Sequence, residues 1–192
     1  TRPVDENINS GSGQHWYEIV KVLLSLNSEF TFTLAHYRKS ENQIYRDVVA
    51  QGGEELILPR NPVSASRALR RQDYDVVHYY LPTLFSPIYG VRARKAVTIH
   101  GAEPVLLPRY YREVHVLHDR YVVPTVTRAM DHIACVSKTT EAYARRHYPL
   151  RSTQRFSTIY NGVDPAFRPL GAGPHGAQLR HGTGEHYFFH VS

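Results

Sequence analysis

Apolar and polar positions along the chain recur with two different periods. In residues 13–27 the apolar positions fall three and four residues apart, which predicts a helix with one buried face. Other segments show the alternation or the short apolar runs of strands, and uninterrupted runs are typical of strands buried on both faces of a parallel sheet. The expected strands are 30–36, 54–59, 76–80, 96–99, 133–136 and 157–160.

Polar residues and glycine mark the ends of two further helices. Ser40 and Gln43 match a capping box, and Gly52 suits the end of the helix that they open. Asn61 followed by Pro62 has the pattern of a cap and a first helical residue, which predicts a short basic helix.

Two more helices are expected later in the chain. Residues 105–131 predict one that Pro124 kinks or interrupts, because proline lacks an N–H and its ring clashes with the preceding turn. Residues 138–148 predict the other, with Ser137 as its cap. Strands that alternate with helices are typical of an α/β fold, so we expect a Rossmann-like open parallel sheet flanked by helices.

The composition shifts near the end of the chain. The glycine-rich residues 171–184 have the character of a linker, and a new strand is expected to begin over 186–191. We therefore predict a Rossmann-like domain over residues 1–170, and a linker with the first strand of a second domain over 171–192. The chain begins at Thr1 rather than at methionine, so the sequence is interpreted as a fragment.

Charge and cysteine content narrow the class of partner. The net charge is +6, and a basic surface favours anionic partners such as phosphates or acidic lipid headgroups. The sequence contains no recognised nucleic-acid motif and no apolar run of transmembrane length, so we expect no nucleic-acid partner. The single cysteine, Cys135, fits a reducing compartment, and we expect a cytoplasmic protein, with contact to a membrane surface left open. The basic clusters are Arg60, Arg67, Arg70 and Arg71, and Arg92, Arg94 and Lys95.

Candidate chemistry gathers where the predicted strands end. Ligands of open parallel sheets bind outside the carboxyl ends of the strands. His100 follows one apolar run, residues 78–80 end another and Ser137 follows a third, so we expect these groups to meet at one rim of the sheet. His115 and His118 have a spacing that would suit zinc on a helix, but with so few local ligands a surface or packing role is the preferred interpretation.

The opening segment 9–16 is rich in glycine and leads into the first helix. Glycine lets a ligand approach the backbone, and the amino end of a helix favours phosphate. Gly11 and Gly13 fit the first two glycines of a dinucleotide fingerprint, but Trp16 stands where the third should be. A Rossmann dehydrogenase is therefore disfavoured, and an ordinary flexible turn remains an alternative for this segment.

A series of stretches carries a resemblance to a known family. In order, they are GSGQHWYEIVKVL, DVVHYY, AVTIHG, DHIACVS and TIYNGVDPAFRP. Together they resemble the amino-terminal domain of family 4 retaining glycosyltransferases, which have the GT-B fold. Asn161-Gly162 alone would predict a hairpin, but in this resemblance it ends the last strand of the domain. The apolar strand that usually precedes the glycine loop is missing from residues 1–10.

The resemblance implies a hexosyl- or related glycosyltransferase. Such an enzyme moves a sugar with retention of configuration from a nucleotide-sugar donor to a glycan, lipid-linked or small-molecule acceptor. No cofactor and no obligatory metal are expected. His100 would lie in the cleft near the transferred sugar, as the catalytic candidate.

The resemblance also implies donor-side and acceptor-side residues. Backbone N–H groups of the glycine segment would approach the donor diphosphate and stabilise charge on the leaving group. The donor-side candidates are Gly11, Ser12 and Gly13, and the acceptor-side candidates are Tyr80, Glu103 and Arg120.

The family's second domain mainly holds the donor, and residues 171–192 would supply only its start. Because transfer requires both reactants to be held in alignment, the chain by itself is expected to show little or no transferase activity. Two other interpretations remain open. One is another GT-B enzyme such as a nucleotide-sugar epimerase, and the other is a non-catalytic module that binds anionic lipid or glycan.

Overall fold

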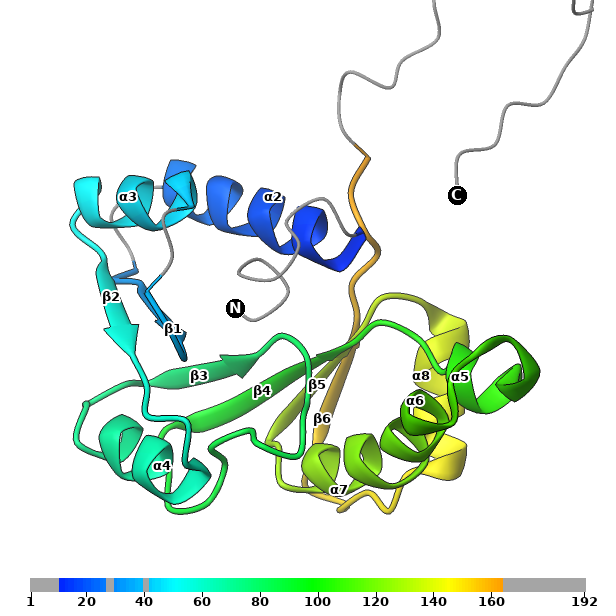
Figure 1. Cartoon of the computed structure of the whole chain (residues 1–192). Helices are drawn as coiled ribbons and strands as arrows, with labels where there is room; N and C mark the ends of the chain where they lie inside the picture. Colours follow the sequence, from blue (N-terminus) through cyan, green and yellow to red (C-terminus); the bar gives the residue numbers. More distant parts are fainter. Residues whose placement is uncertain (1–10, 27–29, 40–41, 164–192) are drawn as a thin grey trace, which may run out of the picture. The chain divides into compact units, whose positions relative to one another are not determined.

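A computed structural model describes residues 11–26, 30–39 and 42–163 of the chain (Figure 1). The chain divides into two compact units, Thr1–Tyr160 and Asn161–Ser192. The first unit contains all the described helices and strands. Of the second unit only 161–163 are described, and they are exposed without regular structure. The linker and new strand predicted over 171–192 lie outside the described residues.

The first unit is an α/β structure in which every described strand pair is parallel, as the sequence predicts. The six strands predicted between residues 30 and 160 are all present. The first three are shorter than expected, the last two are shifted towards the amino terminus, and the strand predicted over 96–99 begins earlier, at Arg94. Their bounds are β1 Thr33–His36, β2 Glu54–Ile57, β3 Val76–Tyr79, β4 Arg94–Ile99, β5 His132–Cys135 and β6 Arg155–Thr158. β1 pairs with β2, and a second sheet has the order β3-β4-β5-β6.

The break between the two sheets lies between β1 and β3, where a doubly wound fold would have another strand. In a doubly wound sheet of order 3-2-1-4-5-6, the first strand lies in the centre, between the second and the fourth. If β1 and β2 are the second and third strands of that order, and β3 is the fourth, the break falls where the first strand would lie. The sequence predicts that residues 1–10 lack the apolar strand that usually precedes the glycine segment. Residues 1–10 lie outside the described part of the chain.

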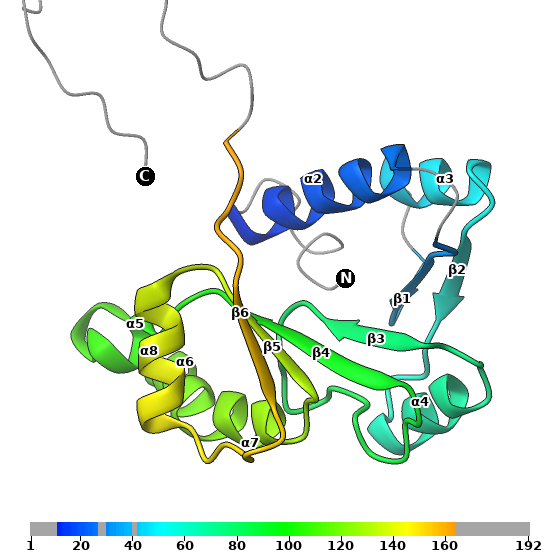
Figure 2. The same ribbon diagram turned by 180° about the vertical axis from the view of Figure 1, so that it is seen from behind.

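Helices cover both faces of the strands (Figures 1 and 2). On one side of β1, Leu34 packs in a core with residues of α2 and α3, including Trp16 and Ile44. Ala35, the next residue, contacts the core that contains Leu69 of α4. Trp16 thus fills the core where a dinucleotide fingerprint would need glycine. The bounds of the main helices are α2 Gly11–Ser25, α3 Gln43–Ala50, α4 Pro62–Arg70 and α8 Lys138–His147.

The helix starts follow local capping chemistry, with one correction to the prediction. Asn61 caps α4 by accepting hydrogen bonds from the N–H groups of its first turn, as predicted. Ser137 likewise caps α8. The capping box predicted for α3 is wrong, because Asn42 caps this helix and Gln43 instead donates to Asp47 in the next turn. The nearer side chain takes the cap position.

The long helix predicted over 105–131 is broken into short pieces. Their bounds are α5 Glu103–Leu106, η1 Pro108–Tyr110, α6 Glu113–Leu117, η2 His118–Val122 and α7 Val123–Arg128. The interruption expected at Pro124 is confirmed, since the wide π-helical turn η2 directly precedes the start of α7. Pro104 and Pro108 also lie in the first turns of their pieces, and these breaks were not predicted.

The largest buried apolar cluster surrounds the middle of the larger sheet. Val97 of β4 is the register partner of Ile133 of β5, and both are fully buried. Met130, which follows α7, and Ala144 of α8 complete this core without exposed surface. This packing holds β4 and β5 in place, and it therefore also positions the residues that follow them, such as His100 after β4.

Candidate functional site

Two strand ends of the larger sheet bring a tyrosine and a histidine into contact. Tyr80 follows β3, His100 follows β4, and these strands are neighbours in parallel pairing. The two rings meet edge to face, with centroids 4.6 Å apart. Tyr80 is buried. The part of the prediction that brings Tyr80 and His100 together at one rim of the sheet is therefore confirmed.

A third residue, His15, completes the cluster and was not among the predicted site residues. Its Nδ1 lies 2.7 Å from the hydroxyl of Tyr80, and its ring meets that of His100 edge to face at 5.3 Å. His15 lies in the first turns of α2, which places the amino end of this helix at the carboxyl ends of β3 and β4. With 12 histidines in the chain, only its position in the glycine segment could have singled it out. We call His15, Tyr80 and His100 the histidine–tyrosine cluster.

Burial keeps this cluster uncharged at neutral pH. It lowers the pKa of His100 to about 4, with smaller contributions from neighbouring His15 and His78, while the Tyr80 backbone acts in the opposite direction. Burial also lowers the pKa of His15 and raises the pKa of Tyr80. The cluster therefore offers neutral hydrogen-bonding groups rather than charges.

One polar atom of the cluster is unsatisfied. Nε2 of His100 is buried and has no hydrogen-bond partner among the residues that the structure describes. A buried polar atom without a partner costs about 1–3 kcal/mol relative to a satisfied one. A ligand hydroxyl at this position would remove that cost, so Nε2 is a candidate contact for a ligand.

Glu103 is close to His100 in the sequence, and its side chain folds back over the backbone of Gly101. It is the exposed first residue of α5, and its carboxylate oxygens occupy the place where a Cβ on Gly101 would lie. Its carboxylate forms no hydrogen bond or ion pair within the described residues. Glu103 is thus free to reorient, and Gly101 makes the room for it.

Within the described residues, Arg120 interacts electrostatically with Tyr143 and not with the cluster. It is exposed in η2, and it lowers the pKa of Tyr143 of α8 while burial raises that pKa overall. No described contact joins it to His100. Its acceptor-side role therefore rests on the family resemblance alone.

Gly11, Ser12 and Gly13 form the first turn of α2 rather than a loop. The first N–H groups of a helix lack acceptors within the helix, and the helix dipole makes this end positive. No acidic side chain lies in the first turn to neutralise it. The predicted donor-side residues thus present a terminus suited to an anion, next to His15.

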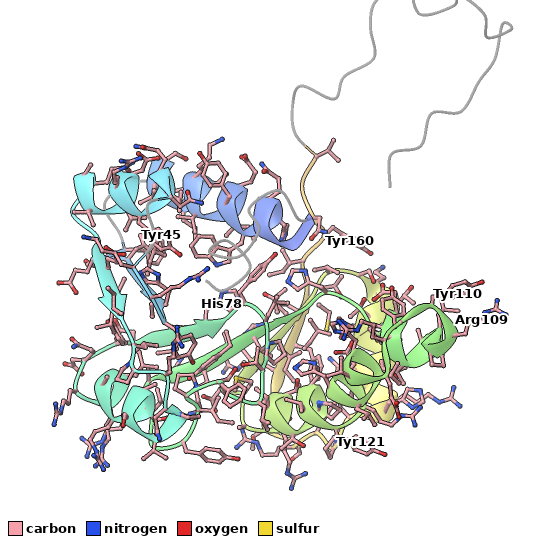
Figure 3. The ribbon with its side chains drawn as sticks, viewed as in Figure 1. Tyr45, His78, Arg109, Tyr110, Tyr121 and Tyr160 are labelled. Carbon is pink, nitrogen blue, oxygen red and sulfur yellow. The ribbon has the colours of Figure 1, made fainter. Side chains whose placement is uncertain are left out.

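Other polar residues singled out from the sequence have structural partners. His78 lies within β3, near its carboxyl end (Figure 3), and Nε2 of its ring is 2.9 Å from Oγ1 of Thr98 on β4. Ser137 caps α8, and no described contact joins it to the cluster. His118 pairs with Asp119, and the described residues contain no group of three or more metal-ligating side chains.

The fold and the site together define a class. The first unit is a Rossmann-like α/β domain, and its uncharged histidine–tyrosine cluster lies at the sheet edge where such domains bind ligands. Within the described ranges, no helix is long and apolar enough to cross a membrane.

Comparison with family models gives the family. The model of Glycosyltransferase Family 4 matches residues 9–167, and the chain belongs to this family. This membership supports glycosyl transfer as the general activity. No curated protein and no solved structure matches the chain.

Proposed function

We propose that the protein is a hexosyl- or related glycosyltransferase that moves a sugar from a nucleotide-sugar donor to an acceptor with retention of configuration, and that this chain forms its acceptor-side lobe. Family membership supports the reaction class. The observation that carries the site assignment is the buried, unpartnered Nε2 of His100 at the carboxyl edge of the sheet, within the described residues.

His100 is proposed to contact the transferred sugar. Its low pKa keeps the imidazole neutral, so Nε2 offers either one N–H or one lone pair. A sugar hydroxyl both donates and accepts, and it therefore suits either tautomer. The role is to fix the sugar in position, because a neutral imidazole of this pKa is a weak base at pH 7.

The amino end of α2 is proposed to hold the donor diphosphate. Gly11, Ser12 and Gly13 are small enough for a phosphate to approach the backbone, and their N–H groups point along the positive end of the helix. These amides would stabilise the charge that develops on the leaving diphosphate. This arrangement is proposed to work without an obligatory metal or other cofactor.

Tyr80, Glu103 and Arg120 are proposed to serve the acceptor, which would be a glycan, a lipid-linked sugar or a small molecule. Glu103 is the most accessible of the three to a ligand near His100, since its carboxylate lies over Gly101. A cytoplasmic location and contact with a membrane surface stay predictions.

Transfer of radiolabelled sugar from a panel of nucleotide sugars tests the proposal. In the full-length protein, His100→Ala is expected to lower kcat by about 10²-fold, as the loss of a positioning contact in the transition state does. His115→Ala, at an exposed position of α6, is the matched control and is expected to leave turnover unchanged. Equal turnover of both variants would remove His100 from the site.

The same assay separates the alternatives. Conversion of the donor sugar without an acceptor would favour an epimerase, and binding of glycan or lipid without any donor turnover would favour a non-catalytic module. We expect the 192-residue chain alone to show little turnover, because the described residues form one lobe and alignment of two reactants requires both. Robust transfer by the chain alone would contradict this expectation.

A further inference from the structure

A pocket lies at the opposite edge of the larger sheet from the histidine–tyrosine cluster. It has a volume of about 380 Å³ and is lined by residues 70–75 and 92–94. These residues lie before β3 and at the start of β4, whereas Tyr80 and His100 directly follow these strands. The backbone N–H of Arg94 donates to the carbonyl of Asp75 at 3.0 Å, which joins the two walls of the pocket. The pocket is therefore separate from the candidate glycosyltransferase site.

The pocket gathers an excess of positive charge. Its lining includes four arginines and two aspartates, so its formal charge is 4 − 2 = +2. All four guanidinium-bearing residues are exposed, and none forms an ion pair within the described part of the chain. By contrast, Arg145 and Arg151 elsewhere in the unit each pair with a carboxylate. The pocket arginines are Arg70, Arg71, Arg92 and Arg94.

The stability of α4 accounts for only two of the four arginines. Arg70 lies in the last turn of α4 and Arg71 is its C-cap, where the negative end of the helix dipole favours cations. Arg92 precedes β4 and Arg94 is the first residue of that strand, so neither belongs to a helix. Their position beside Arg70 and Arg71 therefore has no explanation in the stability of α4.

One residue that lines the pocket carries a buried hydroxyl. Tyr74 lines the pocket, and its ring packs against the core of α4 that contains Leu69. Its hydroxyl is buried and has no hydrogen-bond partner among the described residues. An anion bound within reach of this hydroxyl would accept a hydrogen bond from it and remove the cost of leaving it unsatisfied.

From these observations we infer that the pocket binds a phosphate-bearing anion. Guanidinium groups match the geometry of phosphate oxygens and bind them in a bidentate manner, and they keep their charge at every physiological pH. The volume falls in the range of small-ligand sites, roughly 300–1,000 Å³. The phosphate is carried either by a free small molecule or by the headgroup of an anionic phospholipid. Both sources share the chemistry that the pocket recognises.

Titration of the 192-residue chain with inorganic tripolyphosphate, followed by NMR, tests the inference. The side-chain Nε–H signals of Arg70, Arg92 and Arg94 are expected to shift together, while those of Arg46 and Arg146 stay in place. The amides of Gly11 and Gly13 report separately on the proposed donor site. If the glycine amides do not shift, the arginine signals still show whether the pocket binds the probe.

Paired charge variants make the test specific. Arg70→Gln with Arg92→Gln is expected to weaken binding of the probe by about tenfold or more, since charged hydrogen bonds are lost. Arg46→Gln with Arg146→Gln removes the same charge from exposed positions of α3 and α8, and is expected to change affinity less than twofold. Equal weakening by both pairs would show general charge attraction and overturn the inference.

Tyr74→Phe gives an independent readout. It removes a hydroxyl that has no described protein partner, so thermal stability is expected to stay equal or rise, while affinity falls by roughly 2- to 10-fold. Unchanged affinity in both this variant and the Arg70–Arg92 pair would overturn the inference.

Sedimentation with vesicles identifies the source of the phosphate. Vesicles of phosphatidylcholine that contain about 30% phosphatidylglycerol, an anionic lipid, are compared with vesicles of pure phosphatidylcholine. Both are measured at an ionic strength of about 0.1 M, where the Debye length is about 10 Å. Binding that the Arg70–Arg92 pair abolishes supports a phospholipid headgroup. Binding of tripolyphosphate alone supports a free phosphate compound, and binding of neither probe overturns the inference.

Discussion

Nδ1 of His15 and the hydroxyl of Tyr80 lie 2.7 Å apart, although the two residues are 65 positions apart in the sequence. This contact fixes the amino end of α2 against the end of β3. Because the Tyr80 ring also meets His100, the contact joins the proposed donor-side helix to the proposed catalytic residue. The hydroxyl of Tyr80 is therefore the group whose removal should disturb the site with the least change in packing.

Tyr80→Phe is expected to lower the free energy of unfolding by about 1 kcal/mol and to change the titration of His15, because the ring stays while the hydrogen bond is lost. Denaturant unfolding and NMR titration of the histidine ring signals measure both effects. Tyr79→Phe is the matched control, since the Tyr79 hydroxyl donates to the carbonyl of Pro87 at 2.8 Å. A His15 titration that is identical in the two variants would contradict the proposed contact.

Acid should destabilise the protein through His100. Its pKa is about 4 in the folded protein and near 6.5 when unfolded, so the unfolded state binds a proton that the folded state excludes as pH falls from 6.5 to 4. Above pH 6.5 both states are neutral and the effect is absent. His100→Asn should therefore gain about 2–3 kcal/mol relative to the original chain between pH 7 and pH 4.

Urea unfolding across this pH range measures the difference between the two chains. Carboxylates titrate in the same window, but they contribute equally to both chains and cancel in the comparison. A constant difference in the free energy of unfolding from pH 7 to pH 4 would show that His100 titrates normally.

Gly101→Ala is expected to displace Glu103 at little cost in stability, under about 1 kcal/mol, because the new Cβ meets only the end of a flexible side chain. Gly53→Ala should cost about 1–3 kcal/mol, since its Cβ would lie 2.8 Å from the backbone carbonyl oxygen of Phe32 and 2.5 Å from Cγ1 of Val48. Thermal unfolding of the two variants checks the order. Greater destabilisation by Gly101→Ala would mean that Glu103 cannot move aside.

Asn61→Ala should destabilise the protein by about 1 kcal/mol. Its side-chain oxygen accepts hydrogen bonds from the N–H groups of Val63 and Ser64 at 2.9 and 3.2 Å, and alanine leaves both without this partner. Asn61→Asp, which retains the capping oxygen, is expected to stay within about 0.5 kcal/mol of the original chain. Chemical denaturation of the two variants separates capping from other effects of the position.

Local chemistry explains where the sequence predicted well. The cap at Asn61, the cap at Ser137 and the turn at Gly52, which has φ +84°, each depend on residues only a few positions apart. The interruption at Pro124 is local in the same sense. The choice of Asn42 over Ser40 as a cap and the breaks at Pro104 and Pro108 were missed, because neighbouring residues offered competing signals of similar strength.

By itself, the sequence determined the order of helices and strands, the parallel α/β class and the family, because short-range periodicity and motif order carry that information. It also placed Tyr80 and His100 at one edge, since parallel strands end together. Only the tertiary structure decided that His15 completes the cluster, that Nε2 of His100 is buried without a partner within the described residues, and that Arg92 and Arg94 face the end of α4. These relationships depend on how a helix crosses the sheet and how distant segments pack, and no local pattern encodes either.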